Sequence, residues 1–137
     1  MRSTLVLVLL VCGACNGDVR SAQSAVRDYN AASILAYRTG DLSKLKPVTG
    51  DEELRRIETL LDLKRGAGLV LESSLLSWEA LSAEATGPDG YVIETDERWR
   101  YFDRALTPGQ SPGPRFVADM RMRYELERAG KGWRVLK

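Results

Sequence analysis

The sequence predicts one α+β domain, in which two N-terminal helices pack on a curved antiparallel sheet of about four strands. The spacing of apolar residues is the first reason, because it follows a helical period up to Arg65 and a period of two from Leu69 onward. The second reason is order, since both helical segments precede all the extended ones. The third is length, because 137 residues suffice for one domain with one core.

The first helix is predicted to begin at Ser21 and to end at Gly40. Its apolar residues lie three or four positions apart and form one stripe, namely Ala22, Val26, Tyr29, Ala32 or Ser33, and Ala36. Glycine readily adopts the left-handed conformation that closes many helices, so Gly40 marks the end. The residues before this helix, 15–20, are predicted to form a lipidated N-terminus and short tether, and the domain is predicted to span 21–137.

The second helix is predicted to begin at Thr49 and to end at the segment 66–68. Thr49-Gly50-Asp51-Glu52 has the spacing of a capping box, in which side chains accept from unpaired backbone N–H groups. The apolar stripe consists of Leu54, Ile57 and Leu61. Gly66-Ala67-Gly68 stops the helix. A phosphate-binding glycine loop would follow a strand and open a helix, so the order here excludes one.

Four extended runs are predicted after the helices. The first, 69–85, is the least clearly phased, and the last is 133–137. In the second run, alternate residues share one face, namely Tyr91, Ile93, Thr95, Glu97, Trp99 and Tyr101. In the third, the inner residues are Phe116, Ala118, Met120, Met122, Tyr124 and Leu126. The turn signal at 86–90 and the loop at 107–114 separate these runs.

Charged residues fall on the outer faces of the second and third runs. We expect the arginines of each run to lie opposite carboxylates of the other, which helps to fix the register of the sheet. The expected groups are Arg98 and Arg100 with Asp119 and Glu125, and Arg121 and Arg123 with Glu94 and Asp96. A solvated face explains this pattern, and a recognition surface is the alternative.

Four short motifs carry a resemblance to a known fold. They are Gly40-Asp41-Leu42, Glu97-Arg98-Trp99-Arg100-Tyr101, Tyr124-Glu125-Leu126 and Gly132-Trp133-Arg134-Val135. In this order they resemble the nuclear transport factor 2-like, or cystatin-like, superfamily, and within it the plastid-division intermembrane-space domain group. The resemblance spans 21–137 and implies a cone-shaped domain. Such domains serve as enzymes, ligand pockets and dimerisation modules, so the resemblance implies the fold far more than a function.

The N-terminal segment, 1–14, is predicted to be a removed signal peptide of a bacterial lipoprotein. Its apolar run, 5–11, suits a signal peptide and is too short to span a membrane. Gly13 and Ala14 stand directly before Cys15 and resemble a lipobox, so we expect lipid on Cys15. Two alternatives stay open: lipid on Cys12, and an ordinary secretory signal cut after Ala14.

Lipid on Cys15 would anchor the protein at the cell envelope, outside the cytoplasm. In a Gram-negative cell we expect the periplasmic face of the outer membrane, because Asn16 replaces the aspartate that favours inner-membrane retention in some enteric bacteria. Since the tether is short, we expect a protein partner in or against the same membrane. Homodimerisation is left open. The near balance of basic and acidic residues argues against a nucleic-acid partner.

The candidate functional face is the concave side of the sheet. Its predicted pocket residues are Tyr91, Ile93, Glu97, Trp99, Tyr101, Met120, Met122 and Tyr124. The sequence has no histidine, and no free thiol would remain after lipidation, which removes the common triads and zinc sites. We expect neither metal nor cofactor. Glu97 is the one weak candidate for a catalytic base, and a structural carboxylate is its other interpretation.

Two functional hypotheses follow from this face. The preferred one is a non-catalytic, membrane-anchored binding or assembly module. The alternative is a small-molecule-binding or isomerase-like enzyme that uses Glu97 as its base. An enzyme needs an open cone, whereas an assembly module can fill the cone with Trp99, Met120 and Met122.

Overall fold

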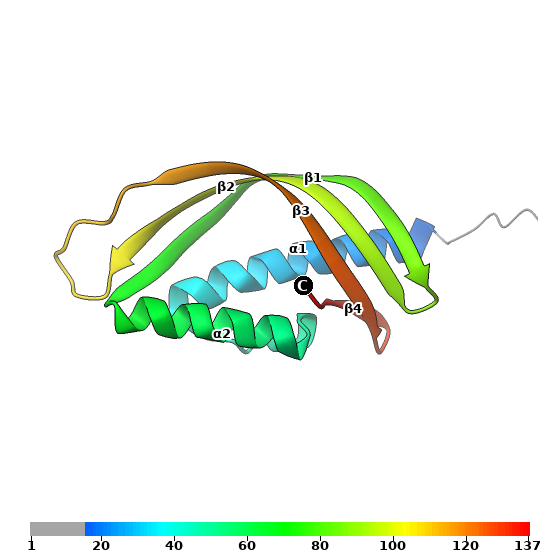
Figure 1. Cartoon of the computed structure of the whole chain (residues 1–137), viewed down its shortest axis with the longest axis horizontal. Helices are drawn as coiled ribbons and strands as arrows, with labels where there is room; N and C mark the ends of the chain where they lie inside the picture. Colours follow the sequence, from blue (N-terminus) through cyan, green and yellow to red (C-terminus); the bar gives the residue numbers. More distant parts are fainter. Residues whose placement is uncertain (1–15) are drawn as a thin grey trace, which may run out of the picture.

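The computed structural model describes residues 16–137, and the predicted signal peptide, Cys12 and Cys15 lie outside these described residues. Two helices lie beneath an arched antiparallel sheet (Figure 1). The elements are α1 (Asn16–Thr39), the 3₁₀ helix η1 (Lys46–Val48), α2 (Asp51–Gly66), β1 (Leu69–Gly87), β2 (Gly90–Ala105), β3 (Phe116–Ala129) and β4 (Gly132–Val135). The strands pair in the order β1-β2-β3-β4. The predicted fold class is therefore confirmed.

The first helix begins earlier than predicted. α1 starts at Asn16, so residues 16–20 are helical and do not form the separate tether that the sequence predicted. Asp18 in the first turn suits the positive end of the helix dipole, and Val19 packs against the core, which extends the helix beyond Ser21. The predicted end is confirmed, because Gly40 has a left-handed φ of 74° and donates to Ala36 O at 2.7 Å.

The second helix lacks the predicted capping box. The N-cap position is occupied by Gly50, and no side chain accepts a capping hydrogen bond there. The capping role predicted for Thr49 was therefore wrong. Thr49 is instead bridged to Val135, beside β4, and Gly50 N donates to Val135 O at 2.7 Å. This pairing holds the chain extended up to Gly50, and the helix begins one residue later. Its end at Gly66 agrees with the prediction.

The sheet explains why the first extended run is poorly phased. β1 is one edge of the sheet, and its register with β2 shifts at three places, two of which leave Leu76 and Leu81 as extra residues. Each extra residue reverses the alternation of faces, and both leucines are exposed, by 45% and 40%. A single alternating pattern therefore cannot describe β1.

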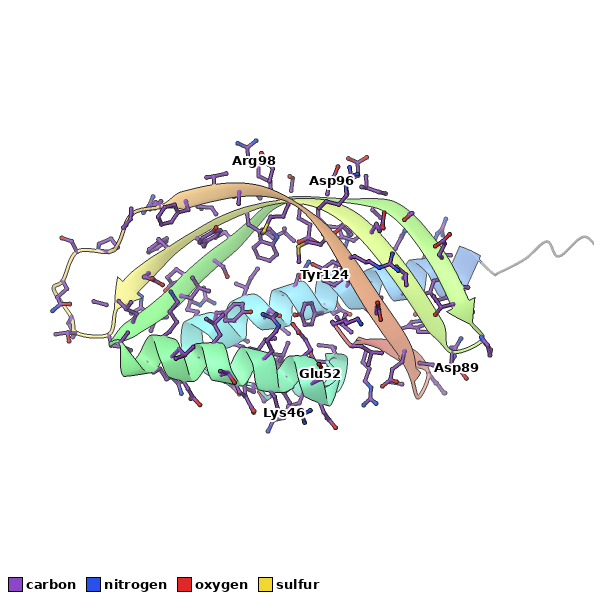
Figure 2. All side chains as sticks on the ribbon, in the orientation of Figure 1. Lys46, Glu52, Asp89, Asp96, Arg98 and Tyr124 are labelled. Carbon is purple, nitrogen blue, oxygen red and sulfur yellow. The ribbon has the colours of Figure 1, made fainter. Side chains whose placement is uncertain are left out.

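β2 and β3 pair without interruption, and their outer charges meet largely as predicted. Arg98 lies opposite Asp119, Asp96 opposite Arg121, and Glu94 opposite Arg123. The three ion pairs have N–O distances of 3.7, 3.0 and 3.3 Å. The predicted partnership of Arg100 with Glu125 was wrong, since Arg100 lies opposite Val117 and Glu125 pairs with Lys137. In Figure 2, Asp96 and Arg98 lie on the outer side of the arch.

The core occupies only part of the space beneath the arch. At the end of the concave face near β4, α1 residues such as Val26 pack against Ile93 and Val135, and none of these three has exposed area. Tyr91 packs edge-on against Trp133, with ring centroids 5.0 Å apart. Between its two ends the sheet arches away from α1 and α2 (Figure 1).

Within residues 16–137, no helix is long and apolar enough to cross a membrane.

Candidate functional site

A cavity of about 390 Å³ lies between α1, α2 and the concave face of the sheet. Its wall is formed by Tyr29, Asn30, Ser33 and Tyr37 of α1, Glu53 and Arg56 of α2, Leu71 and Ser73 of β1, Glu97, Trp99 and Tyr101 of β2, Met120, Met122, Arg123 and Tyr124 of β3, and Lys137. Figure 2 shows Tyr124 in the space between the sheet and the helices. Both α-helices and the three long strands contribute to this wall, and the short strand β4 does not.

Glu97 is the centre of one hydrogen-bond cluster in the wall. Its side chain is only 3% exposed. Oε1 accepts from Thr95 Oγ1 at 2.9 Å, from Tyr124 Oη at 2.8 Å and from Asn30 Nδ2 at 3.3 Å. Oε2 accepts from Trp99 Nε1 at 2.6 Å. These four donors come from α1, β2 and β3, so the cluster ties the first helix to the sheet.

Glu53 is the centre of a second cluster, on α2. It is 5% exposed and binds Arg56 of the same helix through two bonds, from Nε at 2.7 Å and from Nη2 at 2.5 Å. The hydroxyl of Tyr29 also donates to Glu53 Oε1. Since Tyr29 lies on α1, this second cluster ties the two helices together. The negative charge of Glu53 is balanced by the guanidinium of Arg56, as expected for a buried carboxylate.

Three tyrosines of the wall, Tyr29, Tyr37 and Tyr124, have raised pKa values. Burial, followed by the hydrogen bond to Glu53, raises the pKa of Tyr29 far above its ordinary value of about 10. Burial, followed by the charge of Glu97, does the same to the pKa of Tyr124. Burial also raises the pKa of Tyr37. The hydroxyls of Tyr29 and Tyr124 keep their protons near neutral pH and donate them to Glu53 and Glu97.

The rest of the wall is mostly apolar. Trp99 and Tyr101 contribute aromatic rings, while Met120 and Met122 contribute flexible thioethers that adapt to irregular shapes. The hydroxyl of Ser73 is buried and has no hydrogen-bond partner within residues 16–137. Unpaired buried hydroxyls cost roughly 1–3 kcal/mol, so a bound molecule that pairs with Ser73 would gain from it.

The structure brings six of the eight predicted pocket residues into the cavity wall. They are Glu97, Trp99, Tyr101, Met120, Met122 and Tyr124. Tyr91 and Ile93 were predicted there wrongly, because α1 and the chain around β4 cover that end of the concave face and make both residues core. Trp99, Met120 and Met122 border the cavity and leave it open.

Sequence reasoning missed the helical side of the wall. Tyr29 was predicted only as part of an apolar stripe, and Asn30 next to it lies on no such stripe. Glu53 looked like an ordinary acidic residue of a first turn, where such residues favour the helix dipole. The available clue was that two of the chain's five tyrosines, Tyr29 and Tyr37, lie in the first helix.

The site does not resemble a metal centre. In the part of the chain that the structure describes, no three histidine, cysteine, aspartate or glutamate residues gather to hold an ion. Glu53 and Glu97 belong to separate clusters with separate donors.

Solved structures of other proteins share this architecture. The intermembrane space region of the chloroplast protein ARC6 matches with a TM-score of 0.76 and 19% identity, over 88% of this chain and 93% of that chain. A proposed dehydratase of the NTF2-like family from Streptomyces avermitilis matches with a TM-score of 0.55 and 15% identity, over 88% and 92%. This chain has the NTF2-like fold.

A third match is the Kfla4162 protein from Kribbella flavida, with a TM-score of 0.55 and 16% identity, over 86% of this chain and 88% of that chain. At these identities the likeness concerns the fold, which hosts many activities. No protein-family model matches the sequence, and no curated protein matches it.

Proposed function

We propose that this chain is a non-catalytic binding module that holds a small, largely apolar molecule in its cavity. The observation that carries the proposal is the open space of about 390 Å³ between α1, α2 and the concave face. Ligand pockets in proteins have volumes of roughly 300–1,000 Å³, mostly apolar walls and a few polar groups. The cavity has this size and this composition.

The hydrogen bonds favour binding over the alternative of an isomerase-like enzyme. A general base needs a partner group that stabilises the charge developing on the substrate. The tyrosine hydroxyls nearest to the two carboxylates would be candidates for this role. However, Tyr124 donates to Glu97 and Tyr29 donates to Glu53. Since both protons are already committed to carboxylates, neither of these two hydroxyls is free to stabilise such a charge.

The proposal includes a location at a membrane surface outside the cytoplasm, through lipid on Cys15. It is supported by the small residues Gly13 and Ala14 and by the short apolar run before them. Because α1 starts at Asn16, the domain would lie directly against the membrane that holds the lipid. We therefore also propose a partner protein in or on that membrane. Intact-mass analysis of Cys15→Ser and Cys12→Ser variants tests the anchor, and loss of lipid from the Cys12→Ser variant alone would refute it.

Filling the cavity tests the binding function. Ser73→Phe would place a ring in the space and would break no hydrogen bond, since the hydroxyl has no partner among the described residues. Ser74→Phe is the matched control, because successive strand residues point to opposite faces. Calorimetry with 1-octanol, on the unlipidated Cys15→Ser full chain, should detect binding that Ser73→Phe abolishes and Ser74→Phe retains. Equal binding of 1-octanol by the Ser73→Phe and Ser74→Phe variants would refute the proposal.

A further inference from the structure

We propose that the molecule held in the cavity carries an organic ammonium group, which donates a hydrogen bond to Glu97 Oε2. This inference rests on the proposed binding function and specifies the chemical class of the ligand. It starts from the four donors to Glu97, all of which are uncharged: a hydroxyl, a phenol, an amide and an indole. Among residues 16–137, no lysine or arginine forms an ion pair with this carboxylate. Its negative charge is therefore solvated by dipoles alone.

An uncompensated charge in this position favours a cationic ligand. A buried carboxylate has lost most of its hydration, and a cation that enters the same space restores a favourable partner. A carboxylate oxygen has two acceptor positions. Oε1 of Glu97 accepts three bonds, whereas Oε2 accepts only the bond from Trp99. Oε2 is thus the oxygen that can accept one more donor.

The other charges in the wall are already paired. Arg56 binds Glu53 through two hydrogen bonds. Lys137 Nζ lies 3.3 Å from Glu125 Oε2. Arg123 Nη1 lies 3.3 Å from Glu94 Oε1. The pairing leaves Glu97 as the one carboxylate of the wall without a cationic partner in the described structure. An anionic ligand would meet this negative charge and would have to compete for cations that already have partners.

The aromatic part of the wall suits the same chemistry. Five rings border the cavity, those of Tyr29, Tyr37, Trp99, Tyr101 and Tyr124. The faces of aromatic rings carry partial negative charge and attract ammonium groups, with indole the strongest. The indole of Trp99 is fixed next to the carboxylate by its bond to Glu97. The methionines supply apolar surface for the body of the same ligand, which would be amphipathic.

Head-group substitution tests this inference without any change in the protein. Octylammonium, 1-octanol and octanoate have the same chain and differ only in charge. Calorimetry on the Cys15→Ser full chain should give an affinity for octylammonium about tenfold above that for 1-octanol, because a charge-assisted bond to a carboxylate is about twice as strong as a neutral one. Octanoate should bind more weakly than the alcohol.

The outcomes separate this inference from the function on which it rests. If 1-octanol binds as tightly as octylammonium, the cavity binds apolar molecules and the ammonium inference is wrong. If octanoate binds most tightly, the paired cations of the wall decide specificity and the inference is again wrong. If none of the three binds, the binding function itself fails.

A pair of variants then assigns the preference to Glu97. Glu97→Gln should remove the preference for the ammonium, so that octylammonium and 1-octanol bind this variant with affinities within about twofold of each other. Glu94→Gln, on the outer face of the same strand, should change neither. Circular dichroism confirms that each variant is folded. A preference that survives in folded Glu97→Gln would overturn the assignment, and the head-group comparison in the parent chain stands independently of either variant.

Discussion

The two halves of the concave face are built from the same strands, but one half is filled with side chains and the other borders a cavity. Near β4 the face is filled, and Ile93 and Val135 are fully buried. Towards α2 the face is open, and Trp99 and Met120 border a cavity of about 390 Å³. The inward alternation of side chains along β2 continues from Tyr91 to Tyr101 across both halves. The strand sequence alone therefore does not separate a core position from a cavity wall.

The difference arises from the elements that cover each half. α1 presents Ala22 and Ala25 to the filled half, and small side chains let a helix lie close to a sheet. Further along, the same helix presents Tyr29 and Tyr37 to the cavity. Their rings line the space between the helix and the strands. A single helix thus closes one end of the cone and leaves the other end open.

The largest expected effect is the loss of stability when a core side chain of the filled half is truncated. Ile93→Ala should lower the free energy of unfolding by about 3 kcal/mol, because it creates a new void in a packed core. Met120→Ala is the counterpart in the open half, and it should cost less than about 1 kcal/mol because it only enlarges an existing cavity. Urea denaturation measures both. Equal costs would show that the two halves are packed alike.

An intermediate effect is expected from the carboxylate cluster of the open half. Glu97→Gln should lower the free energy of unfolding by about 2 kcal/mol, since the new amide turns N–H groups towards the donors that surround it. Glu94→Gln, in an exposed pair on the outer face, should stay within about 0.5 kcal/mol. A cost for Glu97→Gln no larger than that control would mean that the cluster does not hold α1 to the sheet. The measurement is again urea denaturation.

The last expected effect, which is absent at neutral pH, is alkaline sensitivity of the open half. The pKa values of Tyr29 and Tyr124 are raised in the folded protein, so above about pH 10 the unfolded chain loses these protons first. Stability is therefore retained below pH 10 and falls above it, by at most about 1.4 kcal/mol per pH unit for each tyrosine. Urea denaturation between about pH 9 and 11 measures this slope. Tyr124→Phe should make it shallower, and an unchanged slope would contradict the assignment.

Much of the fold was predictable because the signals are local. Gly40 and the glycines at 66–68 end the helices at their predicted places, since a left-handed conformation favours glycine in any context. The start of α1 was not predictable in this way. It depends on the contact of Val19 with the core, which exists only in the folded protein. The role of Thr49 was missed for a similar reason, because Val135 lies at the far end of the sequence.

The site was predictable on the sheet and not on the helices. Alternation identified Glu97, Trp99 and Met120 as inward residues, and they line the cavity. The helical wall depends on the relative placement of α1 and α2. Glu53 is buried because Tyr29 of the other helix lies against it, and no pattern within either helix specifies that contact.

The irregular first strand has a consequence for how copies of this protein meet one another. β1 is a 19-residue edge strand, and a long straight edge offers its free backbone groups to any neighbouring chain. The extra residues Leu76 and Leu81 interrupt the even spacing of those groups and bend the edge. A second copy therefore cannot add its own edge in register along the whole strand. Molecules crowded together on a surface would resist polymerising into a continuous sheet through β1.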